Sequence, residues 1–149
     1  MARFEFKSQV TVKTSPERAF DYFADHRHVA EVLEGVSNWE PVGTKTRGVG
    51  ARYNVELVAF GLPLRSVLRL NRWKRPAEIG WVSESGLINQ DGGFKFEKAP
   101  AGVRIELHIA YEPPAAFIGA ALARALDRTV RERLKRALEQ IRERLEADR

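Results

Sequence analysis

Hydrophobic and polar residues alternate strictly near the start of the chain. One parity is apolar (Phe4, Phe6, Val10 and Val12), and the other carries Arg3, Glu5, Lys7 and Gln9. A period of two over this length is typical of a strand with one buried face, so we predict a strand over residues 3–12.

Helix signals follow this strand. Ser15 has the character of an N-cap, Pro16 suits the first helical position and Glu17 suits the first turn. Ala19, Phe20 and Phe23 then give the helix an apolar face. Residues 25–28 suggest a break, and residues 29–33 a second short helix before Gly35.

The middle of the chain consists of apolar stretches separated by turns rich in glycine and proline. We predict six strands over residues 36–43, 49–60, 64–75, 77–84, 88–98 and 102–112. The short connections indicate antiparallel neighbours. The sequence therefore predicts an α+β fold in which seven antiparallel strands need cover on one face.

The register of the strand over residues 64–75 is open. Leu68 and Leu70 have the opposite parity to Val67 and Trp73, and a bulge would reconcile the two sets. If Val67 and Trp73 point inward, Arg69 becomes a cation inside the fold. Otherwise Arg69 lies on the solvated face.

A long helix is predicted from Pro113 and Pro114 to about Ala147. Its apolar positions recur at spacings of three and four, and no other element is large enough to cover the sheet. Small residues dominate its first half, from Ala115 to Ala125, and large ones its second half, from Val130 to Leu145. We expect a cavity beneath the first half. The alternative is that the alanines only allow close packing or raise helix propensity.

Three stretches resemble a known family: Val12 to Phe20, Gly92 to Glu97, and Arg104 to Pro114. Their order and spacing resemble the START/polyketide-cyclase-like (SRPBCC) superfamily, in particular its small bacterial cyclase/dehydrase-type members. The resemblance covers the whole chain, residues 1–149 as one domain. It implies the helix-grip fold, in which a curved sheet wraps around a C-terminal helix and a deep hydrophobic cavity lies between them. The family has no universal catalytic motif, so no catalytic residue is assigned.

The inward parity of the strands and the small residues of the long helix give the candidate ligand-binding residues. They are Tyr53, Val55, Leu57, Arg69, Trp73, Trp81, Ser83, Gln90, Phe94, Phe96, Leu107, Ile109, Phe117 and Ala121. Most of them are expected to be core residues, and a minority to touch a ligand. Trp39, Trp73 and Trp81 either form a pocket mouth or fill the interior.

Composition narrows the chemistry. The chain has no cysteine, which excludes disulfides and thiolate sites, and its residues 1–7 lack the apolar run of a signal peptide, so we expect a cytoplasmic protein. The net charge of +5 comes from interspersed signs without a recognition motif, so nucleic acid is not an expected partner. His26 and His28 are two residues apart, which does not place them on one helix face, and we expect neither a metal nor a cofactor.

Three functions remain open. The preferred one is a binding or carrier protein for a hydrophobic lipid, quinone or polyketide-like molecule. The second is a cyclase or dehydratase, which would bring Arg69, Tyr53, Ser83 or Gln90 together in the cavity. The third is a lipid or quinone chaperone whose long helix, through Arg131 and Lys135, contacts an anionic membrane surface transiently.

Overall fold

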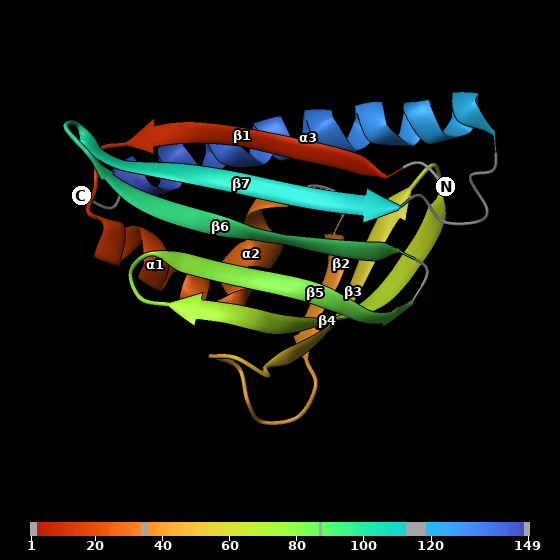
Figure 1. Ribbon diagram of the computed structural model, residues 1–149, viewed down its shortest axis with the longest axis horizontal. Coiled ribbons are helices and arrows are strands. Elements are labelled where there is room, and N and C mark those ends of the chain that lie inside the picture. Colours follow the sequence, from red (N-terminus) through yellow and green to blue (C-terminus); the bar gives the residue numbers. More distant parts are fainter. Residues whose placement is uncertain (1–2, 34–35, 87, 113–118, 148–149) are drawn as a thin grey trace.

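The computed structural model describes residues 3–33, 36–86, 88–112 and 119–147 and shows a curved sheet with one long helix along it (Figure 1). The elements in chain order are β1 (Phe4–Val12), α1 (Pro16–Ala24), α2 (His26–Val32), β2 (Val36–Pro41), β3 (Arg52–Ala59), β4 (Leu62–Lys74), β5 (Glu78–Gly86), β6 (Asn89–Ala99), β7 (Gly102–Glu112) and α3 (Ala120–Ala147). The helix-grip prediction is confirmed. The ends of all seven strands lie within three residues of their predicted places.

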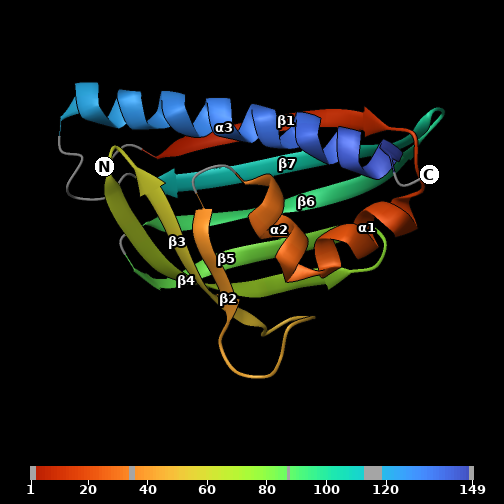
Figure 2. The ribbon, with the colours of Figure 1, turned by 180° about the vertical axis from the view of Figure 1, so that it is seen from behind.

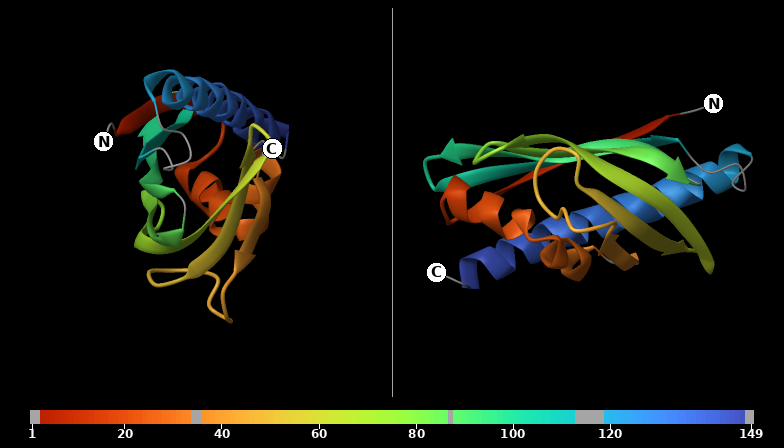
Figure 3. Two further views of the ribbon diagram at one scale, coloured as in Figure 1. Left: turned by 90° about the vertical axis from the view of Figure 1, so that its right-hand side faces the viewer. Right: turned by 90° about the horizontal axis from the view of Figure 1, so that it is seen from below.

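The strands form a single antiparallel sheet in the order β1-β7-β6-β5-β4-β3-β2. Strands β3 to β7 follow one another through short connections, and β1 closes the order by pairing with β7. Seen along its length, the sheet curves into an open trough, and α3 lies across the opening while α1 and α2 lie at its side (Figure 3, left). The concave face therefore has helices on it, and the convex face is open to solvent.

Local sequence explains the first two helices. Ser15 is the N-cap of α1, where its hydroxyl accepts a hydrogen bond from the Arg18 amide at 3.1 Å. The break predicted over residues 25–28 is shorter than expected. Asp25 alone interrupts the helices, because it caps α2 through the Arg27 amide at 3.0 Å. Figure 2 shows both helices on the concave side of the sheet, where α2 contacts β2.

A bulge settles the register of β4. The pairing with β5 shifts twice, between Val67 and Leu68, where β5 has the extra residue, and between Leu70 and Arg72, where β4 has it. The second shift lets Leu68, Leu70 and Trp73 all belong to the inner face. Arg69 alternates with Leu68 and Leu70 and therefore lies on the outer face. The inclusion of Arg69 among the ligand-binding residues was wrong, because the extra residue lies after Leu70 and leaves the parity of Arg69 unchanged.

Helix α3 is anchored through its C-terminal half. Its partner in the sheet is β1, and it also touches α2. Leu138, Ile141 and Leu145 are buried in the main core, and Arg144 pairs with Glu31 of α2 at 3.0 Å. The first turns are packed less tightly, with Leu122 50% exposed. The stretch over residues 113–118, where the sequence predicted the start of this helix, lies outside the described residues.

Candidate functional site

A cavity of about 100 Å³ lies between the sheet and the middle of α3. The sheet contributes Val55 and Leu57 from β3, Trp81 from β5, Gln90 from β6 and Ile109 and Tyr111 from β7, and the rest of the wall consists of Leu33, Trp39, Ile88, Leu126, Val130, Arg133 and Leu134. The wall is thus almost entirely apolar, which is typical of sites for small hydrophobic ligands.

Of the described alanine side chains at the start of α3, Ala121, Ala123 and Ala125, none lines this cavity. Its helical wall consists of Leu126, Val130, Arg133 and Leu134, one to three turns further along. Ala121 is exposed. The expectation that Ala121 lines the cavity was therefore wrong, because the helix turns this position away from the sheet.

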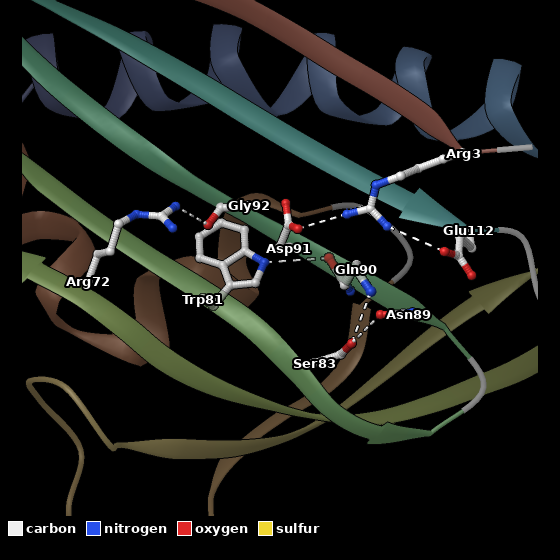
Figure 4. Close-up of polar contacts among 9 residues, drawn as sticks. All are labelled: Arg3, Arg72, Trp81, Ser83, Asn89, Gln90, Asp91, Gly92 and Glu112. Atoms are coloured by element: carbon white, nitrogen blue, oxygen red, sulfur yellow. Dashed lines mark hydrogen bonds and ion pairs between the residues drawn. The ribbon is translucent and has the colours of Figure 1, made fainter.

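Apart from the two tryptophans, three side chains of the wall carry polar groups, and Gln90 is the first of them. Its Oε1 accepts a hydrogen bond from Trp81 Nε1 at 3.4 Å, and its backbone amide donates to Ser83 Oγ at 3.0 Å (Figure 4). Because an indole N–H can only donate, Gln90 turns its oxygen toward Trp81 and keeps its NH₂ group as a donor. Trp81 itself fits over Gly92, where an added Cβ would lie 3.1 Å from the ring.

The outer face of the same strands is held by ion pairs. Arg3 bonds to Asp91 at 2.7 Å and lies 3.6 Å from Glu112, and Arg72 donates to the Gly92 carbonyl at 3.1 Å (Figure 4). These contacts tie β1, β7, β6 and β4 together behind the cavity. They support the strand that carries Gln90 without entering the apolar side.

Tyr111 is the second polar group of the wall. Its hydroxyl donates to Asp127 Oδ1 at 2.9 Å, and Arg131 Nε donates to Asp127 Oδ2 at 2.8 Å. Burial, together with the Asp127 carboxylate, raises the pKa of Tyr111 well above its usual range. The phenol therefore stays protonated at neutral pH, and its proton is already bonded to Asp127.

Arg133 is the third polar group. It extends from α3 toward β3, where its Nη1 donates to the Val58 carbonyl oxygen at 2.8 Å. Val58 lies one residue beyond the last pair between β2 and β3, Val36 with Leu57. Arg133 thus bridges the helix and the edge of the sheet at the side of the cavity and brings a positive charge to an apolar wall.

A second cavity, of about 30 Å³, lies nearer α1 and α2 and is mostly aromatic. Tyr53, Trp73, Trp81 and Phe94 line it, and Phe23 stacks on Phe94 with ring centroids 4.2 Å apart. Tyr53 directs its hydroxyl to the Thr46 carbonyl oxygen, and burial raises its pKa. This space is large enough for about one water molecule.

The structure separates the predicted ligand-binding residues into groups. Val55, Leu57, Trp81, Gln90 and Ile109 line the larger cavity, while Tyr53, Trp73 and Phe94 line the smaller one. Phe96 and Leu107 are core residues, Ser83 accepts a hydrogen bond from the Gln90 backbone amide without lining the cavity, and Phe117 lies outside the described residues. Contact with a ligand stays a prediction for the lining residues.

Sequence reasoning missed the residues that α3 contributes, together with Leu33 and Ile88. The signal was present on the helix, since Leu126, Val130, Arg133 and Leu134 are spaced by three and four and share one face. Of the three tryptophans, Trp39 and Trp81 lie on the walls of both cavities, and Trp73 belongs only to the smaller one.

Within the described ranges, no helix is both long and apolar enough to cross a bilayer. In the same part of the chain, no three histidine or acidic side chains come together as metal ligands would.

Comparison with known proteins gives a family and a fold. Residues 3–146 match the family described as polyketide cyclase/dehydrase and lipid transport. Among solved structures, TTHA0849 from Thermus thermophilus is 22% identical with a TM-score of 0.82, and the match covers 97% of this chain and 98% of that one. The ZhuI aromatase/cyclase from Streptomyces sp. R1128 is 17% identical with a TM-score of 0.77, covering 97% and 94%. DR_A0006 from Deinococcus radiodurans is 17% identical with a TM-score of 0.73, covering 98% and 99%. No curated protein matches the sequence.

Proposed function

Because the chain belongs to the polyketide cyclase/dehydrase and lipid-transport family, we propose that it binds or carries a hydrophobic small molecule between the sheet and α3. The observation that supports this proposal is the cavity of about 100 Å³, to which both layers contribute apolar side chains. An unfilled apolar space is unfavourable for folding, since its walls lack partner atoms. Retention of such a space supports a role in binding.

The volume favours a compact guest. Small-molecule pockets usually measure about 300–1,000 Å³, whereas an engineered apolar cavity of about 150 Å³ holds benzene. The cavity of about 100 Å³ is smaller than both, so in this conformation it suits a guest no larger than a single ring or a short chain. A long lipid chain or a polycyclic polyketide requires α3 to move, and the loosely packed first turns of α3, near the 50% exposed Leu122, are where such movement is expected.

Organic extraction of the purified protein, followed by mass spectrometry, tests the proposal. We expect a compact hydrophobic molecule in stoichiometric amounts from the native chain. The matched control is Val130→Phe, purified in parallel, because it fills the same wall without adding charge. Extracts that contain nothing in repeated preparations, together with failure of small apolar probes to bind, would refute the proposal.

A cyclase or dehydratase is the second candidate, favoured by the buried Tyr111–Asp127 pair beside the cavity. The groups expected to cooperate do not converge. Arg69 is on the outer face, Tyr53 lines the smaller cavity, and only Ser83 and Gln90 are neighbours. Binding without chemistry is therefore the stronger proposal. Incubation of an extracted ligand with fresh protein separates the two, because loss of water from the ligand would indicate a dehydratase.

Contact with an anionic membrane surface stays a prediction. Arg131 donates hydrogen bonds to Asp127 and to the Glu5 carbonyl oxygen, so reversing its charge would disturb the fold as well as any membrane contact. Lys135 is exposed and is the cleaner position for charge reversal. Flotation with anionic vesicles that persists unchanged in Lys135→Glu would count against a surface centred on this residue.

A further inference from the structure

Building on the proposed function, we infer that the guest carries an anionic group, in the simplest case a carboxylate, and that Arg133 binds this group at the side of the cavity. The guest is then a compact apolar body with one acidic oxygen group instead of a purely apolar molecule.

Arg133 has hydrogen-bonding capacity to spare. A guanidinium group carries five N–H donors in a planar fork, and the contact with the Val58 carbonyl oxygen uses Nη1. Among the residues that the structure describes, no carboxylate lies within ion-pair distance of Arg133, whereas its neighbour on the helix, Arg131, has Asp127 at 2.8 Å. Within the described part of the chain, the cavity wall thus contains a cation without a carboxylate partner.

The carboxylate nearest the wall already has partners. Asp127 accepts from Tyr111 with one oxygen and from Arg131 with the other, and the Gln90 side-chain oxygen accepts from Trp81. Apart from the oxygen of the Tyr111 hydroxyl, the side-chain groups left over on the wall are donors, namely the remaining N–H groups of Arg133 and the NH₂ of Gln90. A ligand that satisfies them must bring acceptor oxygens.

The position of Arg133 suits reversible binding of an anion. The residue is half-buried, so its charge keeps contact with water when the cavity is empty and avoids the large penalty of a fully buried ion. The planar fork matches a carboxylate with two parallel hydrogen bonds. An apolar tail would then extend from Arg133 between Val130 and Ile109 on the wall.

The test compares hexanoate with 1-hexanol, which both have six carbon atoms and differ in charge; the alcohol has one more apolar CH₂ group, so a preference for hexanoate cannot come from apolar contact. Binding to the full chain is followed by ¹H–¹⁵N chemical-shift titration, which measures weak affinities. We expect hexanoate to bind about tenfold more tightly than 1-hexanol, a difference of about 1.4 kcal/mol. Added salt should weaken hexanoate binding and leave 1-hexanol unaffected.

Arg133→Gln should remove the preference, by weakening hexanoate about tenfold while 1-hexanol stays within about twofold. Arg128→Gln is the matched control, because Arg128 is exposed on the same helix and does not line the cavity, and it should change neither affinity. Thermal melts of both variants confirm that they fold.

The outcomes separate this inference from the proposed function. Binding of 1-hexanol without any preference for hexanoate, or an equal loss of both in Arg133→Gln, overturns the inference and leaves hydrophobic binding intact. Failure of both probes to bind the native chain overturns the proposed function and the inference with it.

Discussion

Filling the cavity should improve stability and abolish binding at the same time. Val130 lies on the helical wall and is only partly buried, so a larger apolar side chain there points into the empty space. Residual cavity volume costs about 24 cal/mol per Å³. The cavity of about 100 Å³ therefore corresponds to about 2.4 kcal/mol. Val130→Phe adds four carbons and fills about half of it, for a gain of about 1 kcal/mol in the free energy of unfolding.

Urea denaturation measures this gain in the free energy of unfolding. The same gain should raise the melting temperature by about 2–4 °C. Titration with 1-hexanol should show a loss of binding of tenfold or more, since the phenyl ring occupies the position of the guest. Val67→Phe is the matched control, because it is the same substitution on the outer face of β4. A Val130→Phe variant that is less stable than the native chain and still binds 1-hexanol would refute the assignment of the cavity as the site.

Three further predictions concern the frame around the site. Gly92→Val should destabilise the protein by about 1–3 kcal/mol and alter tryptophan fluorescence, because its Cβ would lie 2.7 Å from the His108 carbonyl oxygen and 3.1 Å from the Trp81 ring; an unchanged urea midpoint would contradict this. Ser15→Ala removes the N-cap of α1 and should cost about 1 kcal/mol, with Ser15→Asp as the tolerated control. The hydrogen bond from the Arg27 side chain holds the pKa of Asp25 below its usual range. The Asp25 carboxylate therefore stabilises the fold at pH values above the pKa that Asp25 has in the unfolded chain, and this stabilisation is lost as the pH falls below about 4. Asp25→Asn should flatten the acidic limb of a melting-temperature profile, and an unaltered limb would contradict the assignment.

The elements of the fold were predictable because local signals agreed with one another. Strict alternation in β1 and β7, Gly and Pro at the turns, and the Ser15–Pro16 start of α1 each specify a local conformation without help from distant residues. The start of the second helix was predicted three residues too late. Asp25 both ends α1 and caps α2, and the polar residues that follow it, with His26 and His28 among them, gave no apolar signal for a helix that begins at His26.

The site was predictable only on its sheet side. Alternation assigns Val55, Leu57, Trp81, Gln90 and Ile109 to the inner face, and all five line the cavity. The alternation of apolar and polar residues in a strand does not indicate which part of the strand α3 covers. Inner residues such as Phe96 and Leu107 share the parity of Gln90 and yet pack in the solid core, because α1 and the C-terminal half of α3 cover that end.

The cation of the cavity wall lies on the helix and not on a strand, where the sequence predicted it. Arg69 continues the alternation of Leu68 and Leu70 and lies on the outer face, and the bulge that brings Trp73 inward lies beyond Leu70, where no local residue marks it. The helix offered a better criterion, because its face is defined by spacing alone. Arg133 lies three residues after Val130 and seven after Leu126, within the stripe that covers the sheet. Because Arg133 is half-buried and bonded to the Val58 carbonyl oxygen, its place on this face costs little, and we interpret it as a group that the anion of a ligand can reach. If Arg133→Leu proved more stable than the native chain and still bound hexanoate with unchanged affinity, that interpretation of the stripe would be wrong. We expect instead a more stable protein that has lost its preference for the anion.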